Sequence, residues 1–97
     1  MNALPRNRTA EVVGRHLLRA AVSVGANYRA ACRGKSVAHV ISKLGDVEEE
    51  ADECLFCMEL LIESNLVPAK RMANLMQETN EIIAMIVSSI KTLRDKK

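Results

Sequence analysis

The chain has 97 residues, of which 48% are hydrophobic and 2% aromatic, and it carries a formal net charge of +2. This length supports one domain and excludes a second, because a single core of this size is already only modestly buried. Four glycines and two prolines are too few for the turns of a β-sandwich or barrel, so we expect an all-α fold.

The first predicted helix spans about residues 10–33, after a lead-in at 1–8. Thr9 is the predicted N-cap and Gly34 the predicted C-terminal stop. Apolar residues recur here with the three-and-four spacing of one helical face. These residues are Val13, Leu17, Ala20, Val24, Tyr28 and Ala31.

Two further helices are predicted over about residues 37–64 and 69–94. Ser36 can cap the second helix, and Pro68 suits the first turn of the third. Both helices carry heptad seams, in which apolar residues alternate steps of four and three. The seams are Val40, Leu44, Val47, Ala51, Cys54, Met58 and Leu61, and then Met72, Met76, Thr79, Ile83, Ile86, Ile90 and Leu93.

Short links between long helices favour antiparallel neighbours. We therefore predict an up-down antiparallel helix bundle of three long helices, forming a single domain over residues 1–97. Three glycines lie inside the helices, where each costs about 1 kcal/mol relative to alanine. We interpret Gly14, Gly25 and Gly45 as points where a neighbouring helix packs closely.

Charge is strongly segregated along the chain. Residues 1–43 carry eight basic residues and one acidic residue, whereas residues 44–67 carry eight acidic residues and no basic one. The basic group includes Arg8, Arg15, Arg19, Arg29, Arg33 and Lys35. The acidic run consists of Glu48, Glu49, Glu50, Asp52 and Glu53.

Two functions are open for this basic face. It could bind the phosphates of RNA or DNA in a salt-dependent way that tolerates many sequences. Alternatively, it pairs with the acidic run, within one protomer or across a subunit boundary, and fixes the register of assembly. We favour pairing, because one Tyr, one Phe and no Trp leave no aromatic platform for stacking on bases.

No catalytic or metal-binding constellation is evident. Cys54-Leu55-Phe56-Cys57 is a single Cys-x-x-Cys pair, whereas a structural zinc site needs four ligands, and acidic neighbours should raise the pKa of these thiols. His16 and His39 have no nucleophile at a diagnostic spacing. We therefore expect no enzymatic activity, no cofactor and no small-molecule substrate.

Several separated segments resemble a known family. The segment 17–28, followed by 36–45 and 47–53, resembles the bacterial four-helix bundle proteins, some of which are encoded in intervening sequences of large-subunit ribosomal RNA genes. A related branch includes the accessory variability determinant of diversity-generating retroelements. Residues 80–84 and 88–91 are similar to the last helix of the family.

The resemblance covers nearly the whole chain from Thr9 onward and implies a four-helix bundle. Members of the family carry a first helix ahead of the Leu4-Pro5 region, and this chain begins where that helix would be ending. Either this first helix, the fourth of the bundle, is absent and leaves an apolar groove for another chain to cover, or the sequence is a shortened product. Similar members form ring-like homopentamers, so the resemblance implies a homo-oligomer, of which a pentamer is one form.

The leading expectation is a homo-oligomeric structural scaffold. The alternative is an accessory protein, as the retroelement resemblance implies. Its partner would be RNA, DNA or an enzyme that acts on nucleic acid. No apolar run approaches the roughly 18 residues of a membrane span, and no signal peptide is evident, so we expect a cytoplasmic protein without a membrane partner.

Overall fold

Three long helices make up almost all of the described chain. The computed structural model describes residues 8–95, in which the helices are α1 (Arg8–Cys32), α2 (Val37–Glu63) and α3 (Ala69–Asp95). No strand occurs between residues 8 and 95, so the predicted all-α class is confirmed. The predicted lead-in lies outside the described residues except for Arg8, which is already helical.

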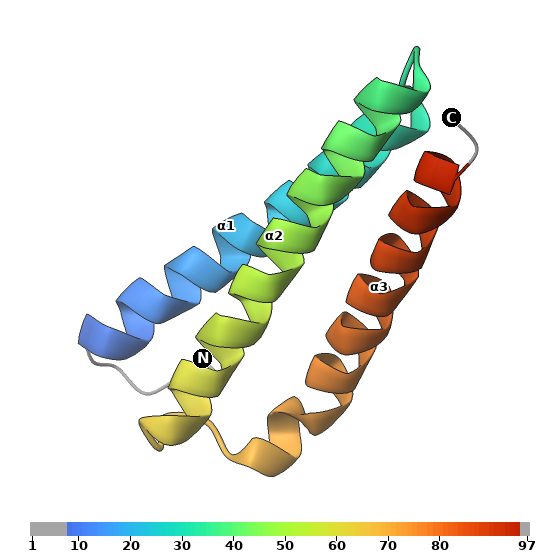
Figure 1. The fold of residues 1–97 in the computed structure, drawn as a ribbon. Coiled ribbons are helices and arrows are strands. Elements are labelled where there is room, and N and C mark those ends of the chain that lie inside the picture. The colour runs from blue at the N-terminus through green and yellow to red at the C-terminus, as the bar shows by residue number, and fades with distance from the viewer. Residues whose placement is uncertain (1–7, 96–97) are drawn as a thin grey trace.

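Figure 1 shows that each helix returns along the one before it, with α2 between α1 and α3 in this view. The described part measures 49 × 20 × 17 Å. Along its length, the backbone of α2 packs closely against α1 and against α3. No Cα atom of α1 comes within 8 Å of a Cα atom of α3 in the described range, so these two helices meet only through side chains.

Local sequence accounts for the ends of α2. Ser36 is the N-cap, as predicted, and its side-chain oxygen accepts a hydrogen bond from the backbone N–H of His39 at 3.1 Å. At the other end Asn65 takes a φ of 60°, a left-handed conformation that asparagine tolerates well. Its N–H donates to the Ile62 carbonyl, which closes the helix before α3 begins just after Pro68.

The predicted ends of the first helix need correction. Thr9 lies inside α1, so it is not the N-cap. Gly34 follows the helix end at Cys32, but its φ is not positive, so it is not a left-handed terminator. Its role is steric, because a Cβ atom at Gly34 would lie 2.5 Å from the Cγ2 atom of Val40. The α1–α2 turn therefore needs a residue without a side chain there.

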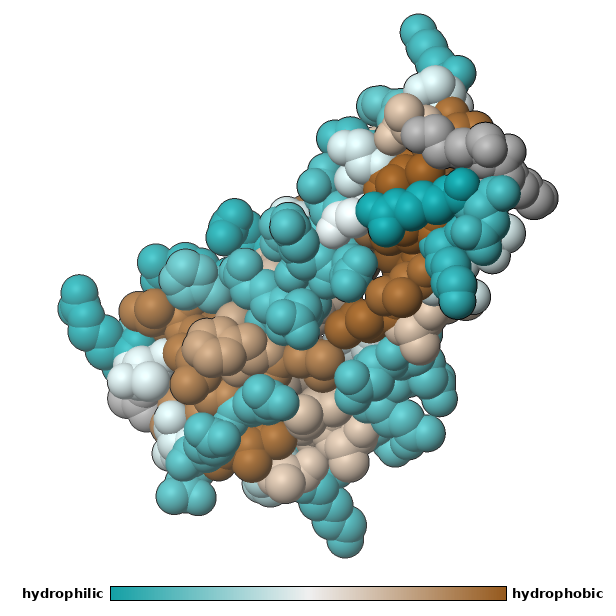
Figure 2. Space-filling model, in the orientation of Figure 1, coloured by the Kyte–Doolittle hydropathy of each residue, from teal (hydrophilic) through white to brown (hydrophobic). Residues whose placement is uncertain are grey.

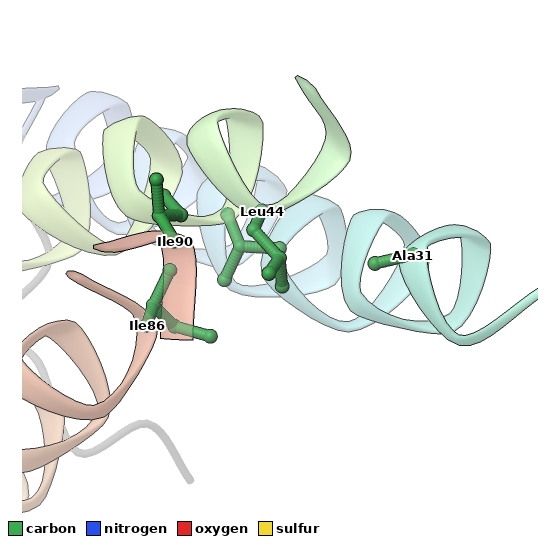
Figure 3. Packing of buried hydrophobic residues seen from close by; sticks show 5 residues of the cluster. Ala31, Leu44, Ile86 and Ile90 are labelled. Atoms are coloured by element: carbon green, nitrogen blue, oxygen red, sulfur yellow. The ribbon is translucent and has the colours of Figure 1, made fainter. Parts of the chain in front are cut away.

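Two clusters of buried side chains hold the helices together, as the predicted seams require. The first joins Ala31 of α1 to Leu44 and Val47 of α2 and to Ile86 and Ile90 of α3. Figure 3 shows the side chains of this cluster converging from the three helices. Such apolar contacts are the main favourable term in the stability of a small bundle.

The second cluster lies nearer the start of α1. Ala20, which is completely buried, contacts Cys54 and Met58 of α2, and Met72 and Met76 of α3 pack against them. The methionines are therefore core residues, which is the ordinary use of a flexible apolar side chain on a seam. One seam residue of the first helix departs from the pattern, because Tyr28 is 51% exposed.

The close-packing interpretation of the glycines is wrong within the protomer for two of the three. No atom outside the local helix lies within 4 Å of the position that a Cβ would take at Gly25 or Gly45. Both glycines therefore border open space. Gly14 instead lines a hollow between α1 and α3.

Candidate interaction surfaces

An open groove runs between α1 and α3 near the start of both helices. It has a volume of about 480 Å³, and almost all of its lining is apolar. We call it the α1–α3 groove. It is lined by Gly14, Leu17, Leu18 and Ala21 of α1, by Leu61 of α2, by Val67, and by Arg71, Met72 and Leu75 of α3. Leu18 is 66% exposed and Leu75 is 47% exposed, so large apolar side chains here remain open to water.

Further apolar side chains are exposed along the same two helices. Val22 of α1 is 63% exposed and Met85 of α3 is 61% exposed, and Ile82 is also exposed. Figure 2 shows one face of the molecule, on which hydrophobic side chains form patches between hydrophilic ones. A single exposed leucine needs no explanation, but apolar side chains grouped in and around a groove mark an interaction site.

The predicted basic face is exposed throughout. Arg8, Arg15, Arg19, Arg29, Arg33 and Lys35 are all exposed. One ion pair joins this face to the acidic run in the described chain, between the Nη2 atom of Arg19 and the Oε2 atom of Glu53 at 3.6 Å. Both side chains are substantially exposed, so the pair adds at most about 1 kcal/mol. Pairing within the protomer is therefore restricted to a single contact.

The predicted acidic run does not form one face. Glu49 and Asp52 are exposed, whereas Glu48, Glu50 and Glu53 are half-buried, because consecutive residues point around the helix. The Oε1 atom of Glu50 is buried and has no hydrogen-bond partner among the described residues. The acidic run therefore supplies a partner for α1 at Glu53 and exposed carboxylates on the far side of α2.

Cys54 and Cys57 are buried free thiols. Burial raises the pKa of both thiols, and the negative charge of Glu53 raises both further. A raised pKa leaves little thiolate at neutral pH, which opposes nucleophilic or redox chemistry. In the described ranges, no three His, Cys, Asp or Glu side chains gather closely enough to hold a metal ion.

One juxtaposition is not apparent from the sequence. The antiparallel pairing of α1 and α2 brings His16 to a hollow of about 340 Å³ that Glu53, Phe56 and Cys57 also line. No hydrogen bond or ion pair links His16 to this Glu or Cys in the described structure. His39 lies apart, at the start of α2. The hollow therefore brings titratable groups near one another without the contacts that acid–base catalysis requires.

Comparison with protein families identifies the chain by sequence. The profile of the 23S rRNA-intervening sequence protein family matches residues 2–88. The chain belongs to this family. The resemblance to proteins encoded in ribosomal RNA intervening sequences is thereby confirmed, and the relation to the retroelement accessory protein stays a prediction.

A solved structure agrees with this family membership. A crystal structure of a protein of unknown function from the S23 ribosomal protein family of Bacteroides thetaiotaomicron is similar, with a TM-score of 0.80 and 32% sequence identity. The match covers 82% of this chain and 74% of that one. A comparison with curated proteins finds no match. No helix between residues 8 and 95 combines the length and apolar character that a transmembrane segment requires.

Proposed function

We propose that this protein is a non-enzymatic scaffold that assembles with copies of itself through the α1–α3 groove. The observation that carries the proposal is the open apolar face between two helices whose backbones do not approach each other. In a four-helix bundle, such a face is covered by another helix. In the proposed assembly that helix comes from another copy, and the resemblance to the family favours a ring of five.

The exposed apolar side chains favour such a contact. Leu18 and Leu75 line the groove, and Val22, Ile82 and Met85 are exposed farther along the same two helices. Full burial of one side chain of this kind is worth roughly 2 kcal/mol, so covering the exposed half of five contributes on the order of 6 kcal/mol per copy. A head-to-tail contact, which a ring requires, covers this face on one copy only, so this gain of about 6 kcal/mol stands against an association cost of about 4–15 kcal/mol, and the neighbour's covering surface must supply the rest. The balance permits stable assembly only if most of the face is covered.

The cysteines agree with a cytoplasmic scaffold. All three are free thiols, and the two on α2 are buried among apolar side chains. A reducing compartment keeps thiols in this form.

Light scattering coupled to size-exclusion chromatography tests the proposal. The variant Leu18→Glu/Leu75→Glu places charges at two exposed positions that line the groove, so we expect it to remain helical and to elute as a smaller species than the wild type. The control Val37→Glu changes an exposed hydrophobic residue on α2 and should assemble normally. Equal masses for the wild type and the groove variant would contradict the proposal.

A second candidate function is binding to nucleic acid through α1. Its specific support is that five of the six basic residues make no ion pair with an acidic residue in the described chain, and the family name refers to 23S rRNA. Neutralising four phosphates makes the logarithm of the affinity fall with the logarithm of salt concentration with a slope of about −3 to −4.

Fluorescence anisotropy with mixed-sequence RNA and DNA at low salt tests this second function. The variant with Arg15, Arg19, Arg29 and Arg33 changed to Glu should lose binding and its salt dependence. Unchanged binding by the variant would remove this candidate.

A further inference from the structure

The outward faces of α1 and α2 carry two stripes with the same spacing. In each stripe the residues follow one another in alternating steps of four and three. The α1 stripe consists of Arg15, Arg19, Val22, Ala26, Arg29 and Arg33. The α2 stripe consists of Gly45, Glu49, Asp52, Phe56, Glu59 and Glu63. Every member is exposed except Gly45, which is half-exposed.

The two stripes are complementary in charge. The α1 stripe has four arginines and no acid, and the α2 stripe has four carboxylates and no base. Each also carries one large exposed apolar side chain near its middle, Val22 at 63% and Phe56 at 57% exposure. The four-three spacing is that of a helical seam, so each stripe can face a second helix along several turns.

The stripes cannot pair within one protomer. Each lies on the side of its helix opposite the buried residues, which for α1 include Ala20 and for α2 include Val47. The one ion pair between the helices joins Arg19 to Glu53, and Glu53 is not a member of the α2 stripe. Arg15 and Arg29 make no ion pair with any described carboxylate. A helix that pairs with either stripe along its length therefore comes from another molecule.

We propose that the α1 stripe of one copy packs antiparallel against the α2 stripe of a second copy. This inference rests on the proposed self-assembly and specifies which faces meet and in which register. The pairing places Arg15 opposite Glu63, Arg19 opposite Glu59, Val22 opposite Phe56, and Arg29 opposite Glu49. Arg33 then lies over Gly45, where no atom occupies the 4 Å around a Cβ position and a long side chain has room.

The antiparallel orientation is favoured over the parallel one by the apolar residues. A parallel arrangement also forms three ion pairs, but it sets Val22 against the carboxylate of Asp52 and Phe56 against Ala26. The antiparallel arrangement brings the two exposed apolar side chains together. It also aligns opposite ends of the helix dipoles, which adds a smaller favourable contribution.

The ion pairs set specificity more than affinity. Exposed pairs contribute little individually and are screened by salt, whereas a pattern of opposite charges excludes wrong registers. Because the two stripes are different surfaces, the contact can repeat from copy to copy and close into a ring. The α1–α3 groove supplies the apolar area in the proposed assembly, and the stripes determine orientation.

Charge reversal followed by mixing tests the inference. One variant carries Arg15→Glu/Arg29→Glu and the other carries Glu49→Arg/Glu63→Arg. Arg19 is left unchanged because it has a partner within the chain. We expect each variant alone to stay helical by circular dichroism and to assemble at least about tenfold more weakly than the wild type in sedimentation velocity. An equimolar mixture should regain assembly in part, because alternating copies match at every contact of an even-numbered assembly and at four of the five contacts of a ring of five.

Single substitutions test the register. Arg29→Glu should be rescued by mixing with Glu49→Arg and not with Glu59→Arg, which is the partner expected for a parallel contact. Rescue by Glu59→Arg would overturn the antiparallel register. The control Lys70→Glu/Lys91→Glu makes the same charge change on exposed residues of α3 and should leave assembly unchanged.

The outcomes separate this inference from the proposed function. If both double variants assemble like the wild type, the stripe contact is wrong and the scaffold stands. If the wild type itself is monomeric, the scaffold fails and the stripe contact fails with it. If wild-type assembly disappears after nuclease treatment, the α1 stripe binds nucleic acid and the inference is overturned.

Discussion

Replacing Gly34 with alanine should destabilise the protein, although alanine normally stabilises a helical chain relative to glycine. The new Cβ would lie 2.5 Å from Cγ2 of Val40 and 3.1 Å from the carbonyl oxygen of Ala31. Val40 is β-branched and half-buried, so its side chain cannot simply rotate away. Overpacking of this kind costs about 1–3 kcal/mol.

The matched control is Gly25→Ala, where no atom lies within 4 Å of the new Cβ. Inside a helix this change should stabilise the protein by about 0.5–1 kcal/mol. Thermal unfolding followed by circular dichroism gives the comparison, with a shift of roughly 4–8 °C per kcal/mol for a chain of this size. All proteins are measured at one concentration, because assembly makes the midpoint depend on concentration.

A double variant shows whether the clash is the cause. The variant Gly34→Ala/Val40→Ala lacks the γ-methyl groups of Val40. Its loss in free energy of unfolding should therefore be smaller than the sum of the two single losses by more than about 0.5 kcal/mol. An unchanged midpoint for Gly34→Ala, or strictly additive losses in the double variant, would refute the steric account of this turn.

Four further predictions concern the core, a helix end and the thiols. Leu61→Ala removes a side chain that is 1% exposed and should cost about 2–5 kcal/mol in chemical unfolding. Ser36→Ala removes the N-cap hydrogen bond of α2 and should lower stability by about 1 kcal/mol in the same assay, whereas an unchanged midpoint would show that the cap is dispensable. Iodoacetamide at neutral pH should label exposed Cys32 well before Cys54 and Cys57, and equal rates by mass spectrometry would contradict their burial. Burial raises the pKa of these two thiols, which favours their neutral form, so stability should fall as the pH rises above the ordinary value of 9.0 and should not change through this cause below it.

The helices and their buried faces could be predicted because the apolar residues that repeat with helical spacing are the same residues that become buried. The seam through Leu44, Val47 and Leu61 alternates steps of four and three, and these residues are buried in the structure. Tyr28 fits the spacing of the first helix and is nevertheless 51% exposed, because spacing along one helix does not say whether a neighbouring helix covers the position.

The glycines and charges were harder to predict, because their roles depend on what faces them. A glycine inside a helix signals close packing only if a neighbour is present, and at Gly25 and Gly45 none is. Opposite charges on adjacent helices suggested broad pairing, but among residues 8–95 only Arg19 and Glu53 form an ion pair between α1 and α2. The spacing along one helix gives relative directions around it, whereas the position of the neighbouring helix comes only from the fold.

The α1–α3 groove shows the same limit. The sequence indicated more apolar surface than three helices can bury, and the resemblance to a four-helix family implied a groove. The sequence did not identify the helices that border this groove, because Leu18 and Leu75 could equally have faced α2. The structure places both at one opening, and this placement underlies the proposed assembly.

Sedimentation equilibrium of the wild-type protein over a range of micromolar concentrations tests the central claim most directly. Self-assembly through the groove predicts a mass that is a multiple of the 10.7 kDa chain and that holds after nuclease treatment. A mass of 10.7 kDa at every concentration would contradict the claim, because the exposed apolar side chains of α1 and α3 would then remain uncovered in solution.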